Sequence, residues 1–308
     1  MRRLGLWLLL APGLVWAVLR LFGWERGFLV QAFAFTPYAA AWTVVPMAIA
    51  LASRRWKEAT ASAAAVVIMA WCVLPRALPD RDRGPTRGTT ITVMTINMFV
   101  GAADPAAIVK LVRDHGVAVL AVQEFSPTAR LGLTHAGLDG LLPYHALADE
   151  VGTTGSGLYS RYPITGSHSE RNGGGNMQVY ATVEAAGPLH VVSAHPLAPY
   201  SLGVLKLWKG DLAAEPTAVI LMGDFNSTLD HTPVRHLIAR GGYRDAADAT
   251  GQGLLGTWGP YDGKPVPPVT LDHVLAARRI GVRDVQVHAV PGSDHRSVIA
   301  TLVVAAGR

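Results

Sequence analysis

A carboxylate and an amide stand two residues apart in the stretch G-D-F-N, where Asp224 and Asn226 follow a short apolar run. The run 219–222 has the length and composition of a buried strand, and Gly223 permits a sharp exit from it. Side chains at positions i and i+2 of an extended chain project to the same side. Two oxygen-bearing groups at a strand end suit a hard cation, or a phosphate with its attacking water. A plain polar turn is the alternative, and the rest of the chain has to decide between the two.

Other residues that could do chemistry also stand at the ends of β-type runs. Carboxylate and amide oxygens suit a hard metal ion, whereas imidazole beside a spare carboxylate suits proton transfer. A single Asn or His after a strand is more often a turn or surface residue than a ligand. The recurrence of such residues at strand ends favours one shared polar site. They are Asn97, Glu124, His195, Asp224, Asn226, Asp272, Asp294 and His295.

Strands and helices must bring these residues together, and the C-terminal two thirds of the chain have the pattern for this. Apolar, β-branched runs predict about ten strands, mostly in hairpins, and Asp-Pro, Ser-Pro and Thr-Pro pairs predict the starts of helices. Hairpins with interspersed helices favour an α/β fold, a two-sheet β-sandwich flanked by helices. The expected strands include 91–99, 117–122, 157–162, 178–184, 189–194, 219–222, 270–276, 282–290 and 297–304.

Composition separates the chain into two parts. The chain has 308 residues, of which 50% are hydrophobic, and this is too apolar for one ordinary soluble domain. Residues 1–89 contain 11 Lys+Arg and 4 Asp+Glu, whereas residues 90–308 contain 16 and 18. The C-terminal part therefore lacks the bulk positive charge that drives non-specific nucleic-acid binding. The single cysteine, Cys72, excludes an intramolecular disulfide and a cysteine-based zinc cluster.

The N-terminal part, residues 1–78, has the pattern of a membrane anchor with three transmembrane helices. The expected spans are 4–19, 27–53 and 59–75, of which the second is the clearest because it holds 27 uncharged residues. Two prolines are expected to kink that second span, which a membrane helix tolerates. A secretory signal peptide is the alternative for the first span, and a buried helix or a hairpin lying in the membrane interface is the alternative for the third.

A linker and the orientation of the spans follow from the polar residues between and after them. Residues 79–90 have no apolar periodicity and predict a mobile linker before a catalytic domain at 91–308. Basic residues before the first span, and between the second and third, place those ends in the cytoplasm and the domain outside it. Arginines directly after the third span argue against this orientation. The two sets are Arg2, Arg3, Arg54, Arg55 and Lys57 against Arg76, Arg81, Arg83 and Arg87.

Seven short motifs occur in order along residues 91–304. They are T-I-N at 95–97, Q-E at 123–124, S-R-Y-P-I at 160–164, H-P at 195–196, G-D-F-N at 223–226, L-D-H-V at 271–274 and S-D-H-R at 293–296. In order and spacing they resemble the endonuclease/exonuclease/phosphatase superfamily, and the chain resembles a membrane-anchored bacterial member. The resemblance implies a DNase I-like fold.

The resemblance also implies a metal site. Asn97 and Glu124 would hold a divalent ion, with Mg²⁺ expected and Mn²⁺ as the alternative, and Asp294 would lie nearby. Phe99 stands where such proteins often carry an acidic or amide residue, so one auxiliary metal contact is expected to be missing.

The remaining residues would carry the reaction. By the same resemblance, Asp224 and Asn226 would position the attacking water and the scissile phosphate. His295, oriented by Asp272, would act as general base or stabilise the transition state. His195 would contact a non-bridging phosphate oxygen or serve the leaving group. Phosphoester cleavage needs these parts on physical grounds, since the non-bridging oxygens must be neutralised and the attacking water activated.

The expected function is metal-dependent phosphoester hydrolysis at or outside the cytoplasmic membrane. The expected partners are the lipid bilayer and a phosphoester substrate. A phospholipid or lipid-linked phosphate is favoured by the membrane anchor and the slightly acidic domain, with extracellular DNA or RNA as the alternative substrate. A catalytically inactive membrane scaffold is the alternative outside the enzyme class. The only feature that supports it is the metal contact expected to be missing at Phe99.

Overall fold

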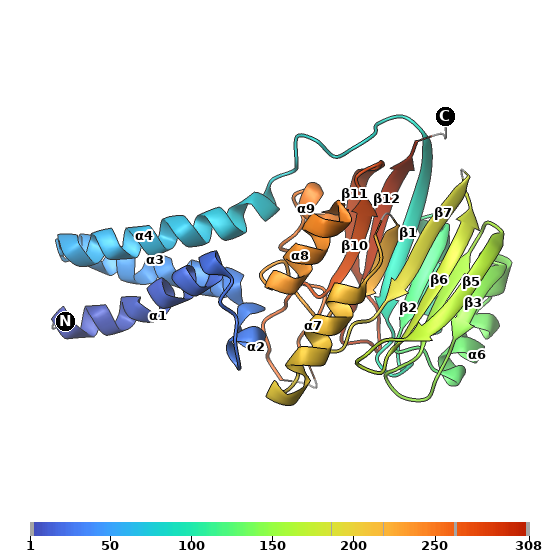
Figure 1. Ribbon diagram of the computed structural model, residues 1–308, viewed down its shortest axis with the longest axis horizontal. Coiled ribbons are helices and arrows are strands. Elements are labelled where there is room, and N and C mark those ends of the chain that lie inside the picture. Colours follow the sequence, from blue (N-terminus) through green and yellow to red (C-terminus); the bar gives the residue numbers. More distant parts are fainter. Residues whose placement is uncertain (1–2, 186, 218, 262–263, 306–308) are drawn as a thin grey trace.

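The molecule consists of a bundle of N-terminal helices and a domain of two packed sheets (Figure 1). The structure is a computed structural model, and it describes residues 3–305 apart from 186, 218, 262 and 263. The described α-helices are α1 (Arg3–Phe22), α2 (Leu29–Phe33), α3 (Thr36–Ala52), α4 (Trp56–Val73), α5 (Pro105–Asp114), α6 (Pro127–His135), α7 (Leu205–Ala214), α8 (Thr232–Gly241) and α9 (Ala246–Ala249). The described strands are β1 (Thr89–Asn97), β2 (Val119–Gln123), β3 (Tyr144–Ala148), β4 (Ser156–Ser160), β5 (Ile164–Arg171), β6 (Met177–Glu184), β7 (Pro188–Ala194), β8 (Ile220–Asp224), β9 (Tyr243–Asp245), β10 (Asp272–Ala277), β11 (Ile280–Ala289) and β12 (Arg296–Val304).

The described residues of the domain form two six-stranded sheets, which confirms the predicted two-sheet sandwich flanked by helices. The first sheet has the order β11-β12-β1-β2-β4-β3, and the second has the order β5-β6-β7-β8-β10-β9. The pairs β1–β2 and β7–β8 are parallel, and the other neighbouring strands are antiparallel. A large apolar core joins the two sheets, and a second core lies where α5 and α6 pack on the first sheet. Figure 1 shows α7, α8 and α9 between the second sheet and the N-terminal helices.

Three strands were not predicted from the sequence, namely β3, β5 and β9, and all three lie at sheet edges. The strands β3 and β5 bury few side chains, so their apolar alternation is weak, and β9 has only three residues. The strand β5 is the clearest case, because seven of its eight residues are exposed and its sequence I-T-G-S-H-S-E-R is mostly polar.

Strand pairing brings the polar ends of the strands together. In the first sheet the parallel pairing of β1 and β2 sets Asn97 opposite Gln123, directly before Glu124. In the second sheet the antiparallel pairing of β10 and β8 sets Asp272 opposite Asp224. Gly223 lies so close to β7 that an added Cβ would be 1.9 Å from the carbonyl oxygen of Ala194. Only glycine therefore fits directly before Asp224.

The N-terminal helices differ from the prediction in the second span. Residues 27–53 were expected to form one long helix, but they form the short α2 and then the 17-residue α3. The break falls at Ala34 and Phe35, and Pro37 lies in the first turn of α3, where its missing amide hydrogen costs nothing. Proline therefore starts a helix here instead of kinking one.

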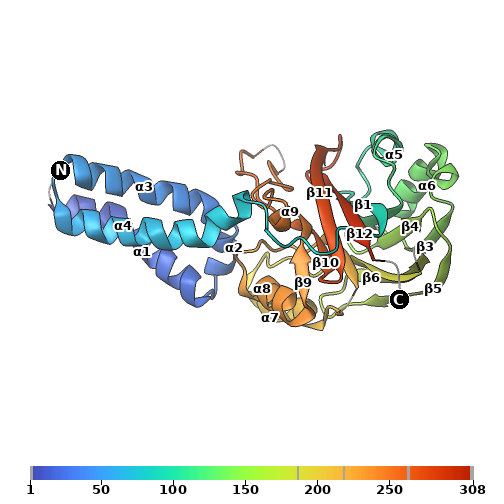
Figure 2. The same cartoon turned by 90° about the horizontal axis from the view of Figure 1, so that it is seen from above.

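The prediction of three long membrane helices is accordingly corrected to two. Among the described residues, Leu4–Phe22 and Trp56–Ala77 are long and apolar enough to cross a membrane, and Thr36–Ala52 is shorter. Figure 2 shows α1, α3 and α4 side by side, extending away from the sheets, while α2 lies next to the domain.

The segment 79–90 runs along the sheet domain and is hydrogen-bonded to it. The amide of Asp80 donates to the carbonyl oxygen of Ala249 at 2.9 Å, and the amide of Val282 donates to the carbonyl oxygen of Arg83 at 2.8 Å. The first strand then begins at Thr89.

Candidate active site

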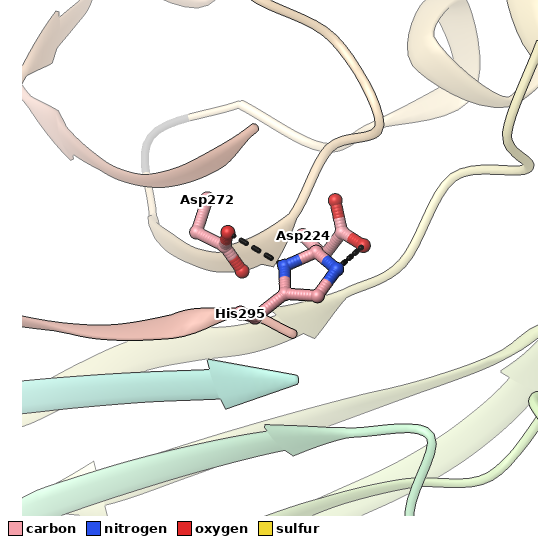
Figure 3. A group of neighbouring side chains, drawn as sticks. All are labelled: Asp224, Asp272 and His295. Carbon is pink, nitrogen blue, oxygen red and sulfur yellow. Dashed lines mark hydrogen bonds and ion pairs between the residues drawn. The ribbon is translucent and has the colours of Figure 1, made fainter. Parts of the chain in front are cut away.

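Three buried side chains from three strand ends form the centre of the site (Figure 3). The imidazole of His295 lies between two carboxylates: its Nδ1 is 2.8 Å from Asp272 Oδ2, and its Nε2 is 3.7 Å from Asp224 Oδ2. Although burial lowers the pKa of His295, the nearby carboxylates of Asp272 and Asp224 outweigh it and raise the pKa to about 10. The ring is therefore protonated at neutral pH, with its Nδ1–H donated to Asp272.

A second imidazole approaches the same carboxylate oxygen. His195 Nε2 lies 3.9 Å from Asp224 Oδ2, and burial lowers the pKa of this ring. Its Nδ1 has no hydrogen-bond partner within the described parts of the chain. The two histidines therefore differ in charge, because one is held between carboxylates and the other is buried with a single, more distant carboxylate.

Asn97 and Glu124 approach Asp224 from the first sheet, at the ends of β1 and β2. The amide Nδ2 of Asn97 donates to Glu124 Oε1 at 3.1 Å and to Asp224 Oδ2 at 3.0 Å. Glu124 Oε2 accepts a hydrogen bond from the amide of Val100 at 2.8 Å. Burial and, less strongly, the charge of Asp224 raise the pKa of Glu124. Two carboxylates thus converge on one amide group.

Asp294 completes the polar surface beside His295. Its Oδ2 accepts a hydrogen bond from Trp258 Nε1 at 2.9 Å, and its Oδ1 lies 4.0 Å from His295 Nε2. Ser293 ties this loop to β1, because its hydroxyl donates to the carbonyl oxygen of Asn97 at 2.8 Å. The loop before β12 is therefore fixed against the strand that carries the predicted metal ligand.

Asn226 follows Asp224 in a tight polar turn. Its amide donates to Asp224 Oδ1 at 2.8 Å, and its side-chain Nδ2 donates to the carbonyl oxygen of Pro196 at 3.0 Å. Both Asn226 (φ 48°) and Glu124 (φ 51°) adopt the left-handed backbone conformation that non-glycine residues seldom adopt. Such strain persists only where surrounding contacts impose it, and it concentrates at functional sites.

The residues of the site fit a divalent cation. Four carboxylates, from Glu124, Asp224, Asp272 and Asp294, surround one imidazolium, so negative charge is in excess. Asp272 Oδ1 and Asp294 Oδ1 are buried and, over the residues described, have no hydrogen-bond partner. A buried carboxylate oxygen without a donor is costly, and a bound cation would remove that cost.

Two sets of ligands are available for such an ion. Asp224, Asp272 and His295 each offer one atom, and these atoms lie within 4.8 Å of one another. That set differs from the predicted ligands Asn97, Glu124 and Asp294. Because His295 Nδ1 is already bonded to Asp272, and because Mg²⁺ prefers oxygen over imidazole, the predicted oxygen ligands suit Mg²⁺ better.

All eight residues predicted from strand ends are brought to this edge of the sandwich. Sequence reasoning missed Trp258, Ser293 and the pair Asn172 and Asn176, whose side chains both donate to the carbonyl oxygen of His195, at 2.9 and 3.0 Å. The two asparagines frame the Gly-rich turn N-G-G-G-N, which was the signal available. Trp258 has no local signal, because it reaches Asp294 from a loop 36 residues away.

His273, adjacent to Asp272, lies outside the site. Its Nδ1 is 2.7 Å from Asp245 Oδ2 and its Nε2 is 2.9 Å from the carbonyl oxygen of Ser227. Successive residues of a strand point to opposite faces, which explains why Asp272 and His273 have different partners. The site therefore contains a protonated imidazole, a neutral imidazole and a cluster of carboxylates, the groups needed to bind and hydrolyse a phosphoester.

Comparison with known proteins assigns the domain. A family model described as the Endonuclease/Exonuclease/phosphatase family matches residues 94–295. No curated protein matches the chain.

Several solved structures share the fold. An endonuclease/exonuclease/phosphatase from Beutenbergia cavernae DSM 12333 is similar with a TM-score of 0.54 and 19% identity, over 70% of this chain and 72% of that one. A humanised D. rerio TDP2 has a TM-score of 0.55 and 15% identity, over 69% and 98%. Sphingomyelinase C from Streptomyces griseocarneus has a TM-score of 0.52 and 18% identity, over 69% and 99%. The chain belongs to the endonuclease/exonuclease/phosphatase family and is a metal-dependent phosphoric ester hydrolase.

Proposed function

We propose that the protein is a membrane-anchored, Mg²⁺-dependent phosphoesterase that acts on a phospholipid or a lipid-linked phosphate. The observation that carries this proposal is the direct docking of long apolar helices onto the domain that holds Asp224, Asp272 and His295. The domain supplies the chemistry, and the helices would hold it at a bilayer surface.

The exposed surface of the helices supports a membrane. Only 28% of Leu4–Phe22 and 33% of Trp56–Ala77 is buried, whereas a core helix of a soluble protein is mostly buried. Large apolar side chains on them, such as Trp71 and Val67, are 78% and 67% exposed. An apolar surface of this extent needs a cover, and helices of 19 and 22 residues match the thickness of a bilayer core.

The arrangement of the helices supports a domain outside the cytoplasm. The N-terminus and the turn between α3 and α4 lie at the end of the bundle that is far from the sheets (Figure 1). The positively charged ends predicted to be cytoplasmic are therefore on one side, opposite the domain, and this orientation requires the 17-residue α3 to cross the bilayer together with α1 and α4 (Figure 1). Arg76, which argued against this orientation, is buried in an ion pair with Asp230. A reporter fused after Val304 tests the orientation, and a cytoplasmic signal would contradict it.

The site has groups for each part of the reaction. Asp224 can orient the attacking water and take up its proton, because burial, and more weakly the charge of Asp272, raises the pKa of its carboxyl. His295 can stabilise the charge that develops on the phosphoryl oxygens, since Asp272 holds its Nδ1–H and leaves Nε2–H free to donate. His195 is placed to hydrogen-bond a phosphate or leaving-group oxygen. Mg²⁺ held by Asn97, Glu124 and Asp294 would neutralise negative charge on the substrate.

The substrate class rests on charge and on the helices. The chain from residue 90 onward carries a net charge of −2, so it lacks the positive field with which nucleases attract a polyanion. One structural neighbour is a sphingomyelinase, which fits a lipid headgroup. A nuclease is the second candidate, because a D. rerio TDP2 complexed with a single-strand DNA product also shares the fold.

Hydrolysis assays on the full-length protein in detergent micelles test the proposal. With Mg²⁺, we expect release of phosphate or headgroup from phospholipid vesicles to exceed nicking of supercoiled plasmid. His295→Ala and Asp224→Ala should abolish turnover, whereas Asp114→Asn, which removes a surface carboxylate paired with Lys110 on α5, should not. Undiminished turnover in both site variants would contradict the assignment of these residues to the active site. A preference for plasmid would favour the nuclease.

A further inference from the structure

The loop that carries Asn226 is held at its other end by the N-terminal helices. This segment, residues 225–232, runs from the end of β8 to the first residue of α8 and is called the catalytic loop. It begins directly after Asp224 and contains Asp230 only four residues after Asn226. Four residues of chain span at most about 14 Å, so a displacement of Asp230 can change the position of Asn226.

Asp230 is fully buried between two arginines of the N-terminal helices. Arg20 Nε donates to Asp230 Oδ1 at 2.6 Å. Arg76 forms a bidentate ion pair with the same carboxylate, with Nη1 2.8 Å from Oδ2 and Nη2 2.7 Å from Oδ1. Arg20 lies in α1 and Arg76 directly after α4, so one carboxylate of the domain joins both helices.

Two further contacts fix the same end of the loop. The amide of Thr228 donates to His231 Nδ1, so His231 Nε2 carries the hydrogen that it donates to the carbonyl oxygen of Val30 at 2.8 Å. The amide of Thr232 donates to Glu25 Oε1 at 2.9 Å. Four residues of the N-terminal part thus contact three successive residues of the catalytic loop.

The contacts continue through the loop toward the site. The amide of Asp230 donates to Thr228 Oγ1 at 3.2 Å, and Ser227 accepts a hydrogen bond from Trp208 Nε1 at 2.9 Å. The carbonyl oxygen of Ser227 also lies 2.9 Å from His273 Nε2. Hydrogen bonds therefore hold Ser227 and Thr228, which lie in the chain between the strained residue Asn226 and Asp230.

We propose that Arg20 and Arg76 are positioning residues for catalysis, which act through Asp230 on the conformation of Asn226. The N-terminal helices are then a part of the folded enzyme and not only a tether. A buried carboxylate that loses its two arginines must find water or another donor, and the catalytic loop has to move for this. The inference rests on the proposed phosphoester hydrolysis, since it assigns Asn226 to that reaction.

The variant Asp230→Asn in the full-length protein in detergent micelles tests the inference. The soluble diester bis(p-nitrophenyl) phosphate with Mg²⁺ is the probe, because its KM does not depend on a lipid surface. We expect kcat to fall by about tenfold or more with KM within about twofold. In the Asn226→Ala background the same change should alter kcat by less than about twofold, because both variants remove one function. Asp114→Asn is the matched control and should leave kcat unchanged.

Hydrogen–deuterium exchange separates this inference from the proposed function. The amides of Asn226, Thr228, Asp230 and Thr232 all donate hydrogen bonds, so they should exchange faster in Asp230→Asn while the amides of β6 stay protected. If the wild type hydrolyses no phosphoester, the proposed function fails. The exchange rates alone then test whether Asp230 and its arginines hold the catalytic loop. Where Asp230→Asn does not fold, Arg20→Gln replaces it, because Arg76 then still pairs with Asp230. Unchanged exchange in the catalytic loop, or independent effects of the Asp230 and Asn226 changes on kcat, would overturn the inference.

Discussion

His295 Nδ1 lies 2.8 Å from Asp272 Oδ2, and both side chains are buried where the two sheets meet. The carboxylate of Asp272 fixes which ring nitrogen carries a hydrogen toward the substrate, and its charge is the largest of the interactions that raise the pKa of His295. Orientation and charge of the catalytic imidazole therefore both depend on Asp272.

Asp272→Asn is expected to lower kcat by about 10²–10⁴-fold, because the amide neither charges the ring nor fixes its hydrogen. The measurement is kcat/KM against pH for a soluble phosphodiester. The limb that reports His295 should move to lower pH in the variant, because the pKa of the ring falls when the carboxylate is removed. A wild-type rate and profile would contradict the assigned role.

His273→Asn is expected to affect stability more than chemistry. His273 forms a second buried pair with Asp245, at 2.7 Å, on the opposite face of β10. Breaking a buried pair leaves Asp245 without its partner and costs about 3–5 kcal/mol of unfolding free energy. Urea unfolding measures this loss, while kcat per folded molecule should fall less than in Asp230→Asn, because the loop loses only the hydrogen bond to the carbonyl oxygen of Ser227. A selective loss of kcat would instead place His273 in the site.

The two pairs illustrate what the sequence could predict. Alternation along the strand placed Asp272 and His273 on opposite faces, and apolar runs ending in polar residues predicted the strands that meet at the site. The partners of these residues could not be read in the same way. Asp245 approaches His273 from 28 residues away in the chain, Trp258 likewise approaches Asp294 from 36 residues away, and no local pattern encodes either approach.

The N-terminal part shows the same limit. Its apolar composition predicted membrane helices. Uniform hydropathy does not indicate where a helix ends, however, and the second span consists of two helices. The charge of Arg20 and Arg76 was visible, whereas their shared partner lies 210 and 154 residues away. Contacts of such sequence separation depend on the whole fold and not on local propensity.

Gly223→Ala is expected to disrupt the site without touching a catalytic atom. The new Cβ would lie 1.9 Å from the carbonyl oxygen of Ala194, so β7 and β8 would have to separate. We expect a loss of about 3 kcal/mol or more in unfolding free energy, together with loss of turnover. Gly140→Ala is the control, because the space around its Cβ is open. Equal melting temperatures for the two variants would contradict the close packing.

Divalent cations are expected to stabilise the protein through the carboxylates around Asn97. At a concentration about ten times the dissociation constant, a cation raises the unfolding free energy by about 1.4 kcal/mol. Thermal unfolding with Mg²⁺ or with a chelator measures the effect. Glu124→Gln should reduce the stabilisation, while Asp114→Asn on the remote α5 should retain it. A Mg²⁺ response that is the same in both variants would exclude Glu124 as a ligand.

Glu215 is expected to make the domain less stable as the pH rises. This residue is 1% exposed, and both carboxylate oxygens are without a hydrogen-bond partner among the residues described. Burial raises the pKa of its carboxyl from the ordinary value of 4.5 to about 8. An acid of this kind stays neutral in the folded state while it ionises in the unfolded chain, so the unfolded state gains once the pH exceeds about 4.5. Stability should therefore fall from about pH 4.5 to pH 8 and then level off.

Glu215→Gln should remove that slope, because the amide has no charge to bury. At pH 7 we expect the variant to be more stable than the wild type by on the order of 3 kcal/mol, from the difference between the folded and unfolded pKa values. The gain should vanish near pH 4, where the wild-type carboxyl is neutral in both states. Urea unfolding of both proteins from pH 4 to pH 8 measures the slope. Parallel curves would mean that Glu215 is ionised in the folded protein and that a cation, supplied by solvent or by rearranged side chains, pairs with it.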